Sequence, residues 1–216
     1  MRIDIYSDTA CPWCYLGKRR FDLAMAARPH FEPRVTWRSF ELNPDLPAEG
    51  TDRASYLAAK IGDPARIAEV HAELQRQGRV AGIEFRFELM ERMPNTRNSH
   101  LLIAYAARSG RQSAVKDRIM KAFFEEGCDI GDIEVLVRLG VEAGLAERES
   151  QSALILRAGL DGVIAAERHA AVLGITAVPT YVFDGQYTIS GAPDVGVFAR
   201  ILDQVAEFAA ARRVAR

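Results

Sequence analysis

Two of the three cysteines stand close together near the start of the chain, in the segment Cys11-Pro12-Trp13-Cys14. Cysteines at this spacing serve as metal ligands, as a structural crosslink, or as a redox pair that alternates between dithiol and disulfide. A structural zinc needs about four ligands, and beyond this pair the sequence offers only Cys128, four scattered histidines and no second Cys-x-x-Cys. Three cysteines also cannot form a disulfide framework. We therefore expect no metal site and favour the redox pair.

The two cysteines differ in their expected position on a helix. If Cys11 is the residue before the first helical turn, Pro12 occupies the first helical position, where its missing N–H costs little. The N–H groups of Trp13 and Cys14 then point toward the Cys11 sulfur, and the helix dipole favours negative charge there. We therefore predict a lowered pKa for Cys11, which makes it the nucleophile. Cys14, one turn further on the same face, is predicted to have the higher pKa and to act as the resolving thiol.

A second segment with chemical potential is Val178-Pro179-Thr180, which precedes a β-rich run at 181–183. The proline is either an ordinary trans residue at a strand edge or a cis residue at a sharp turn. A cis bond fits the apparently central strand better, and it would leave backbone groups free to pair with an extended substrate peptide. The candidate substrate-binding residues are therefore Pro12, Trp13, Val178, Pro179 and Thr180.

The elements that must position these residues form an α/β pattern with a helical interruption. We predict strands at 2–7 and 35–40 around a helix at 12–27, and mostly helix from 45 to 158. A helix at 161–173, a hairpin with an Asp184-Gly185 turn and a last helix from about Pro193 complete the chain. The predicted domains are a discontinuous α/β domain of residues 1–44 and 159–216 and a helical insertion of residues 45–158. Cys11 falls in the turn after the first strand, where open α/β sheets commonly build sites.

Composition and charge narrow the class of protein. The formal net charge is −1, which gives no reason to expect nucleic acid or an anionic membrane as a partner. Hydrophobic residues make up 49% and charged residues 26%, which suits a folded core. The alternating start, Ile3-Asp4-Ile5, is unlike the apolar core of a signal peptide. We therefore expect a cytosolic location, where most thiols stay reduced.

Three further residues carry weaker signals. His100 stands at a predicted helix start, where it either lines the site and pairs with a thiolate or, as is more common, is an ordinary core or surface residue. Glu41 ends the second strand, either as a proton acceptor or, more usually, as a solvated carboxylate. Cys128 lies among acidic residues, which should raise a thiol pKa, and we expect a bystander thiol.

The two motifs together resemble the DsbA family of the thioredoxin superfamily, and within it the FrnE-like branch, over almost the full chain. The shared segments are Cys-Pro-Trp-Cys-Tyr-Leu-Gly-Lys-Arg-Arg-Phe at 11–21, Phe-Glu-Leu-Asn-Pro at 40–44, Glu-Gly-Cys-Asp-Ile-Gly-Asp at 126–132 and Val-Pro-Thr-Tyr-Val-Phe-Asp-Gly at 178–185. The resemblance implies a thioredoxin-like fold with a large all-helical insertion, a cis-proline at Pro179, and a redox-active disulfide formed by Cys11 and Cys14. It implies no required organic cofactor, with glutathione as a candidate reductant, and disulfide- or thiol-containing proteins or small thiols as partners.

Two alternative functions stay open at this point. The kappa-class glutathione transferases and 2-hydroxychromene-2-carboxylate isomerases are similar in fold, but they typically have serine where Cys11 stands. Thioredoxin folds also serve as non-catalytic peptide-binding or chaperone modules. Because both cysteines are present, we favour a cytosolic thiol-disulfide oxidoreductase.

Overall fold

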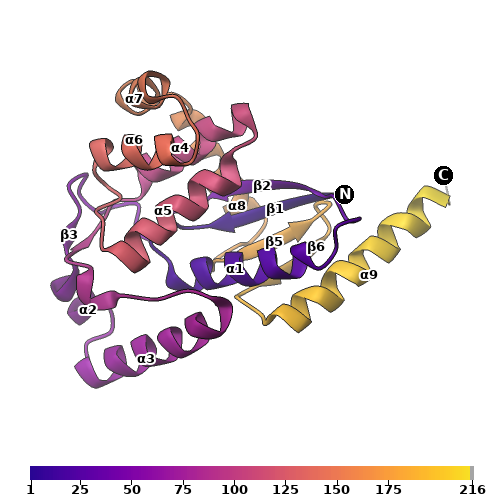
Figure 1. Cartoon of the computed structure of the whole chain (residues 1–216), viewed down its shortest axis with the longest axis horizontal. Helices are drawn as coiled ribbons and strands as arrows, with labels where there is room; N and C mark the ends of the chain where they lie inside the picture. The colour runs from indigo at the N-terminus through magenta and orange to yellow at the C-terminus, as the bar shows by residue number, and fades with distance from the viewer. Residues whose placement is uncertain (215–216) are drawn as a thin grey trace.

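The computed structural model describes the backbone of residues 1–214 and the side chains of residues 1–208. Its main sheet has four strands in the order β2-β1-β5-β6. β1 (Arg2–Ser7) pairs in parallel with β2 (Arg34–Ser39) and antiparallel with β5 (Thr180–Phe183), which pairs antiparallel with β6 (Tyr187–Ser190). β1 and β5 are almost entirely buried because they lie in the middle of the sheet. The sheet therefore places the end of β1 beside the start of β5 (Figure 1).

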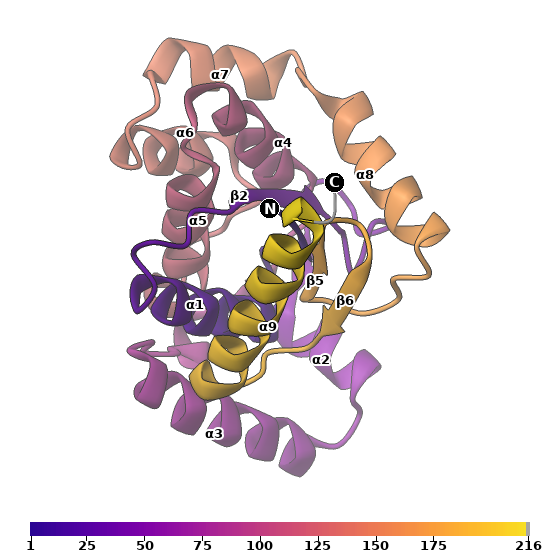
Figure 2. The ribbon, with the colours of Figure 1, turned by 90° about the vertical axis from the view of Figure 1, so that its right-hand side faces the viewer.

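Helices cover both faces of this sheet. α1 (Pro12–Ala26) and α9 (Val195–Val214) lie together on one face, and α8 (Leu160–Val172) lies on the other (Figure 2). Phe21 of α1, Tyr181 of β5 and Phe198 of α9 pack with ring centroids 5.0 to 5.8 Å apart. Offset and edge-to-face aromatic packing of this kind adds to the hydrophobic stabilisation of burial. This arrangement is the thioredoxin-like α/β architecture that the sequence predicts.

The segment between β2 and α8 is mostly helical, as predicted. Its α-helices are α2 (Arg53–Lys60), α3 (Pro64–Ala81), α4 (Arg97–Ala106), α5 (Gln112–Glu126), α6 (Ile133–Glu142) and α7 (Glu147–Ile155), with single 3-10 turns at Phe87–Leu89 and Ala107–Ser109. One feature differs from an all-helical insertion: β3 (Thr51–Asp52) and β4 (Arg92–Met93) form a short antiparallel ladder. Two residues per strand are too few to produce the alternation by which strands are recognised in a sequence.

Local turn and cap signals decide where several elements begin and end. The Asp132 carboxylate accepts hydrogen bonds from the Glu134 and Val135 amides at the start of α6, and Asp132 is therefore the N-cap of this helix. Asp184 and Gly185 have positive φ, 48° and 70°, and the Gln186 amide donates a 2.9 Å hydrogen bond to the Phe183 carbonyl, so a tight turn joins the two strands. The predicted hairpin between β5 and β6 is therefore confirmed.

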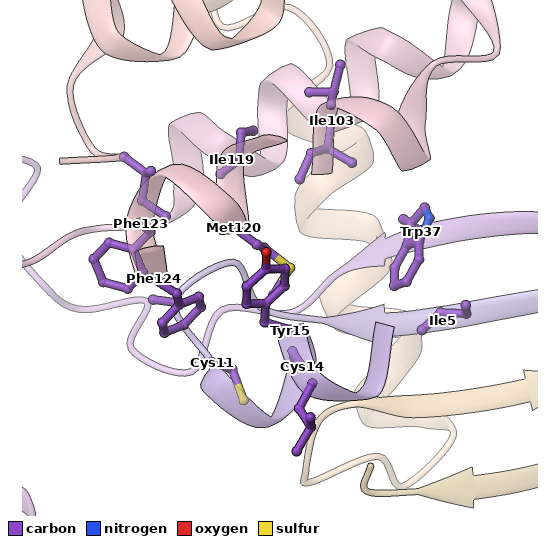
Figure 3. Close-up of a cluster of buried hydrophobic side chains, with 14 of the residues drawn as sticks. Ile5, Cys11, Cys14, Tyr15, Trp37, Ile103, Ile119, Met120, Phe123 and Phe124 are labelled. Carbon is purple, nitrogen blue, oxygen red and sulfur yellow. The ribbon is translucent and has the colours of Figure 1, made fainter. Parts of the chain in front are cut away.

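The insertion shares its core with the sheet. A single cluster of buried apolar side chains runs from β1 and α1 into α4 and α5. Tyr15 of α1 stacks on Phe124 of α5 with ring centroids 5.6 Å apart, and Met120 and Phe123 lie nearby in Figure 3. The predicted division into two domains, residues 1–44 with 159–216 and residues 45–158, stays a prediction. The shared core means that the insertion has a fixed position over the helix that carries both cysteines.

Candidate active site

The structure brings the two predicted motifs together. Cys11 is the N-cap of α1, with an extended backbone, and Pro12 begins the helix. The Cys11 thiol donates a 3.8 Å hydrogen bond to the carbonyl of Val178, and the Val178–Pro179 peptide bond is cis. Cys14 lies one turn further along α1 and is fully buried, and both cysteines are free thiols. The arrangement therefore holds one sulfur beside the Val178 backbone and a second sulfur behind it.

The other predicted substrate-binding residues divide into exposed and internal ones. Trp13 is 37% exposed beside Cys11, whereas Pro12 and Val178 are half-buried. Thr180 is buried, and its hydroxyl donates to the Ala177 carbonyl at 2.7 Å and bonds the Ser190 hydroxyl at 2.8 Å. The side chain of Thr180 thus holds the loop before β5 against the hairpin and does not point to solvent.

The expectation of a lowered Cys11 pKa is wrong. The hydrogen bond of the Cys11 thiol with Cys14, burial, and the negative charges on Cys14 and Asp8 raise the pKa of Cys11 well above its usual value. The backbone amide of Cys14 acts in the opposite direction, as the helix-terminus argument requires, but it is outweighed. The helix position of Cys11 was predicted correctly, but the hydrogen bond with Cys14 and the burial of Cys11 decide the direction of its pKa shift.

Asp8 is a buried charge near Cys11 that the sequence analysis did not single out. It is 1% exposed, and its Oδ2 accepts a 2.7 Å hydrogen bond from the Leu42 amide. Its Oδ1 lies 3.3 Å from Nε2 of His100 on α4. Burial raises the pKa of Asp8, but His100, the Leu42 amide and Thr96 together lower it below its ordinary value. Asp8 is therefore a stable carboxylate behind the active-site turn.

His100 is buried, at 2% exposure, and its ring nitrogen faces Asp8. His100 is therefore a core residue with a charged partner. The Cys11 thiol bonds the Val178 carbonyl, and among the described residues no hydrogen bond joins it to His100. Next to it, Ser99 bonds the Thr9 hydroxyl at 2.6 Å and donates to the Thr96 carbonyl at 2.7 Å. The start of α4 is thereby fixed to the turn between β1 and α1. In the sequence, Asp8 looked like an ordinary turn residue because its partners come from distant elements.

Glu41 also differs from expectation, because its side chain is buried and not solvated. Its Oε1 accepts a 2.8 Å hydrogen bond from Arg97, and that carboxylate is 1% exposed. Glu167 on α8 lies beside it, and burial, the hydrogen bond with Glu41 and the charge of Glu41 raise the pKa of Glu167 to about 7. The two carboxyl groups therefore share a proton below neutral pH, and this link joins α8 to the end of β2.

We predict that the wild-type protein loses stability as pH rises through neutrality and that Glu167→Gln abolishes this pH dependence. The folded-state pKa of about 7 lies above the ordinary value of 4.5, so the protonated form stabilises the fold. That stability is fully present below the ordinary value and is lost as pH rises through about 7, at a cost on the order of 2 kcal/mol once solvent screening of this half-exposed carboxyl group is allowed for. Urea unfolding of wild type across this range should show the loss, and Glu167→Gln should flatten it. Glu69→Gln, on the exposed face of α3, is the matched control. Equal pH profiles for wild type and Glu167→Gln would contradict the shared proton.

Cys128 lies apart from the pair, in the turn after α5. Its sulfur accepts a 3.9 Å contact from the guanidinium of Arg138 on α6. Among the side chains of residues 1–208, no group of three or more His, Cys, Asp or Glu is arranged to hold a metal ion. Across residues 1–214, no helix is both long and apolar enough to cross a bilayer.

Comparison with known proteins assigns the chain to a family. It matches the DSBA-like thioredoxin domain over residues 2–203. It is 30% identical over 203 residues to the Bacillus subtilis protein YwbO, covering 94% of this chain and 96% of YwbO. It is similar to the structure of a probable DsbA oxidoreductase, SCO1869 of Streptomyces coelicolor, with 38% identity, a TM-score of 0.87, and 96% and 90% of the two chains covered. It shares its fold with the cytosolic disulfide reductase DsbM of Pseudomonas aeruginosa, solved with GSH, at 19% identity, a TM-score of 0.69 and 98% coverage of both chains. The predicted DsbA resemblance is thus confirmed, and the chain belongs to the DSBA-like thioredoxin domain family of disulfide oxidoreductases.

Proposed function

We propose that this oxidoreductase exchanges disulfides through a redox pair formed by Cys11 and Cys14. The observation that carries the proposal is the placement of the two sulfurs. Cys11 caps α1 and contacts the Val178 carbonyl, while Cys14 is buried one turn behind it. A substrate sulfur can therefore reach Cys11 first, and only Cys14 is positioned to attack Cys11 from within the protein.

The reaction balances with these two thiols alone. The Cys11 thiolate attacks one sulfur of a substrate disulfide, a mixed disulfide forms, and the other substrate sulfur leaves as a thiolate that takes up a proton. The Cys14 thiolate then attacks the Cys11 sulfur, and the second substrate sulfur leaves and is protonated. The dithiol has given up two electrons and become a disulfide, and the substrate has become two thiols. Run in reverse, the same steps oxidise a dithiol, and no organic cofactor is needed.

The substrate surface is expected to accept an extended peptide. The Val178 carbonyl points at Cys11, and within the described residues its amide has no hydrogen-bond partner. Trp13 and Leu42 expose 37% and 38% of their surfaces, and the amide of Leu42 donates a hydrogen bond to Asp8. An extended chain can pair with the Val178 backbone and place apolar side chains on these two residues. The cis-proline, Pro179, lies at the base of this surface.

Two further parts of the proposal concern the reductant and the compartment. Because the pair ends as a disulfide after reducing a substrate, an outside thiol must restore it, and glutathione is the candidate. Support comes from DsbM, a cytosolic disulfide reductase whose structure contains GSH. By the same analogy we propose that this chain works in the cytosol, on disulfide-containing proteins or small thiols.

Reduction of an insulin-type protein disulfide tests the proposal. Wild type should accelerate the reduction, Cys11→Ser should fall to the uncatalysed rate because the attacking sulfur is gone, and Cys128→Ser should keep wild-type activity.

The raised pKa of Cys11 predicts that its alkylation rate is still rising above the pH at which a free cysteine, with a pKa of about 8.5, levels off.

The alternatives give different results in the same assay. A glutathione-dependent transferase or isomerase activity that survives Cys11→Ser would favour the kappa-class relatives, since these typically have serine at this position. Suppression of aggregation without any disulfide reduction would favour a peptide-binding module. Either outcome would contradict disulfide exchange as the working function.

A further inference from the structure

Lys116 of α5 is a buried cation without an anionic partner. It is 1% exposed, and its ammonium lies 5.1 Å from the centre of the Trp37 ring. Within the described side chains, no carboxylate lies within ion-pair distance of it and no hydrogen-bond acceptor contacts it. Burying an ammonium without a counter-charge is costly. A nearby group that becomes negative only during part of the reaction can supply the missing counter-charge.

Lys18 of α1 provides the contrast. It is 3% exposed and lies over the same Trp37 ring, at 5.8 Å. Its ammonium, however, is paired with Asp22 at 2.6 Å and with Asp117 at 2.9 Å. Two carboxylates thus compensate the cost of burying the Lys18 ammonium beside Trp37. Among the described side chains, Lys116 has no such carboxylate partner.

The place of Lys116 is fixed from both ends of α5. At the first end, the Gln112 side chain accepts from the Trp37 amide at 3.1 Å and donates to the Trp37 carbonyl at 3.2 Å. At the other end, Tyr15 of α1 donates a 2.5 Å hydrogen bond to Glu125. These bonds hold α5, and with it the backbone of Lys116, against β2 and α1.

The charges around Lys116 belong to the active site. Burial lowers the pKa of Lys116 to about 8, while negative charge on Cys14, Asp8 and Cys11 acts in the opposite direction and Lys18 adds to the lowering. Lys18, which covers the same Trp37 ring as Lys116, stands one turn after Cys14 on the same face of α1, so the ring and both ammonium groups lie beside the turn that carries Cys14. Of the negative neighbours, Cys14 acts most strongly on Lys116. The Asp8 carboxylate already accepts a hydrogen bond from the Leu42 amide and faces the His100 ring. Cys14 is negative only when its thiol has lost a proton, which is the state it needs in order to attack.

We propose that Lys116 supplies the positive charge that stabilises the Cys14 thiolate when Cys14 attacks the mixed disulfide. The proposal rests on the proposed exchange function and adds a positioning residue from the insertion. Cys14 gives its proton to solvent, its sulfur bonds to the Cys11 sulfur, and the Cys11–substrate bond breaks. The leaving substrate thiolate takes up a proton, so protons and electrons balance. Lys116 keeps its own proton and acts only through its charge.

The test measures the ionisation of Cys14 alone. In a Cys11→Ser, Cys128→Ser background, thiolate absorbance followed against pH reports only Cys14. Loss of an opposite charge at close range raises a thiol pKa by about one unit or more, so Lys116→Met should shift the Cys14 midpoint upward by that amount. Lys116→Arg, which keeps the charge, should leave the Cys14 midpoint where it is in the protein with Lys116. Lys121→Met, on the exposed side of the same helix, should change nothing.

A second measurement guards against a purely structural role. If the buried ammonium is kept for function, Lys116→Met should raise the urea midpoint of unfolding, because a well-packed apolar side chain of similar size replaces an unpaired charge. An unshifted Cys14 midpoint, or a Lys116→Met protein that is less stable, would overturn the proposal. The titration needs no substrate. A shifted midpoint in a protein without exchange activity would therefore count against the proposed function and leave the role of Lys116 standing.

Discussion

A Cys14→Ser variant should accumulate covalent adducts on Cys11 that a reducing agent releases. The substitution keeps the attacking sulfur at the start of α1 and removes the buried sulfur behind it. The mixed disulfide then has no internal attacker and persists until an outside thiol arrives. Wild type should carry almost none, because Cys14 resolves each adduct as it forms.

The experiment is best done in cells quenched with acid, which stops thiol exchange. Cys128 lies in the turn after α5, in contact with Arg138, so a Cys14→Ser, Cys128→Ser protein should trap as well as the single variant. Cys11→Ser, Cys14→Ser is the matched control and should trap nothing. Protein adducts would name the substrates, and glutathione as the sole adduct would point to glutathione-linked chemistry. An unmodified Cys11 in a variant whose thiol is otherwise reactive would contradict disulfide exchange.

The residues of the proposed redox pair stand out in the sequence because their signals are local and unusual. A Cys-x-x-Cys at a strand-to-helix turn and a proline before a central strand each limit the backbone in their own neighbourhood. Their meeting in space follows from sheet order, since β1 and β5 pair and both motifs lie at the same edge. The resemblance to the DsbA family rests on these same segments.

The buried charges were not predictable in the same way. A charged residue in a sequence is usually solvated, so Asp8, Glu41 and Lys116 gave no sign of burial. Their roles depend on partners contributed by α4, α8 and α1, which only the assembled fold brings close. The wrong prediction for the Cys11 pKa has a related origin, because the helix terminus is visible in the sequence, whereas the hydrogen bond of the Cys11 thiol with Cys14 and its burial are not.

Gly17→Ala should damage both the fold and the exchange activity, because Gly17 is where α1 approaches the loop before β5. A methyl group there would lie 2.8 Å from the Tyr181 hydroxyl oxygen and 3.0 Å from Cγ of Pro179. Tyr181 is fully buried between Phe21 and Phe198, so it cannot move aside. Alanine in a helix interior normally gains about 1 kcal/mol over glycine, whereas overpacking of this kind costs about 1 to 3 kcal/mol. We expect net destabilisation.

The activity should fall further than the stability, because the clash lies between the helix that Cys11 caps and the residue after Val178. The Cys11 thiol donates a hydrogen bond to the Val178 carbonyl, so a shift of either segment displaces the sulfur. Displacing reacting groups by about 1 Å can cost on the order of 100-fold in rate. Urea unfolding and disulfide reduction on the same samples measure both effects. Gly162→Ala on α8, where a methyl group would meet nothing within 4 Å, is the matched control and should be neutral or stabilising.

Tyr181→Phe offers a way to relieve the clash and so to identify its cause. The Tyr181 hydroxyl is buried without a hydrogen-bond partner among the described residues, so removing it alone should cost little. Combined with Gly17→Ala, it removes the oxygen nearest to the new methyl group and should recover part of both the lost stability and the lost activity. A double variant no better than Gly17→Ala would place the damage at the other two close neighbours of the methyl group, Pro179 and Ala192. A Gly17→Ala protein with wild-type stability and activity would show that α1 and the Pro179 loop are not tightly coupled, and the close fit between the two motifs would then have no bearing on exchange.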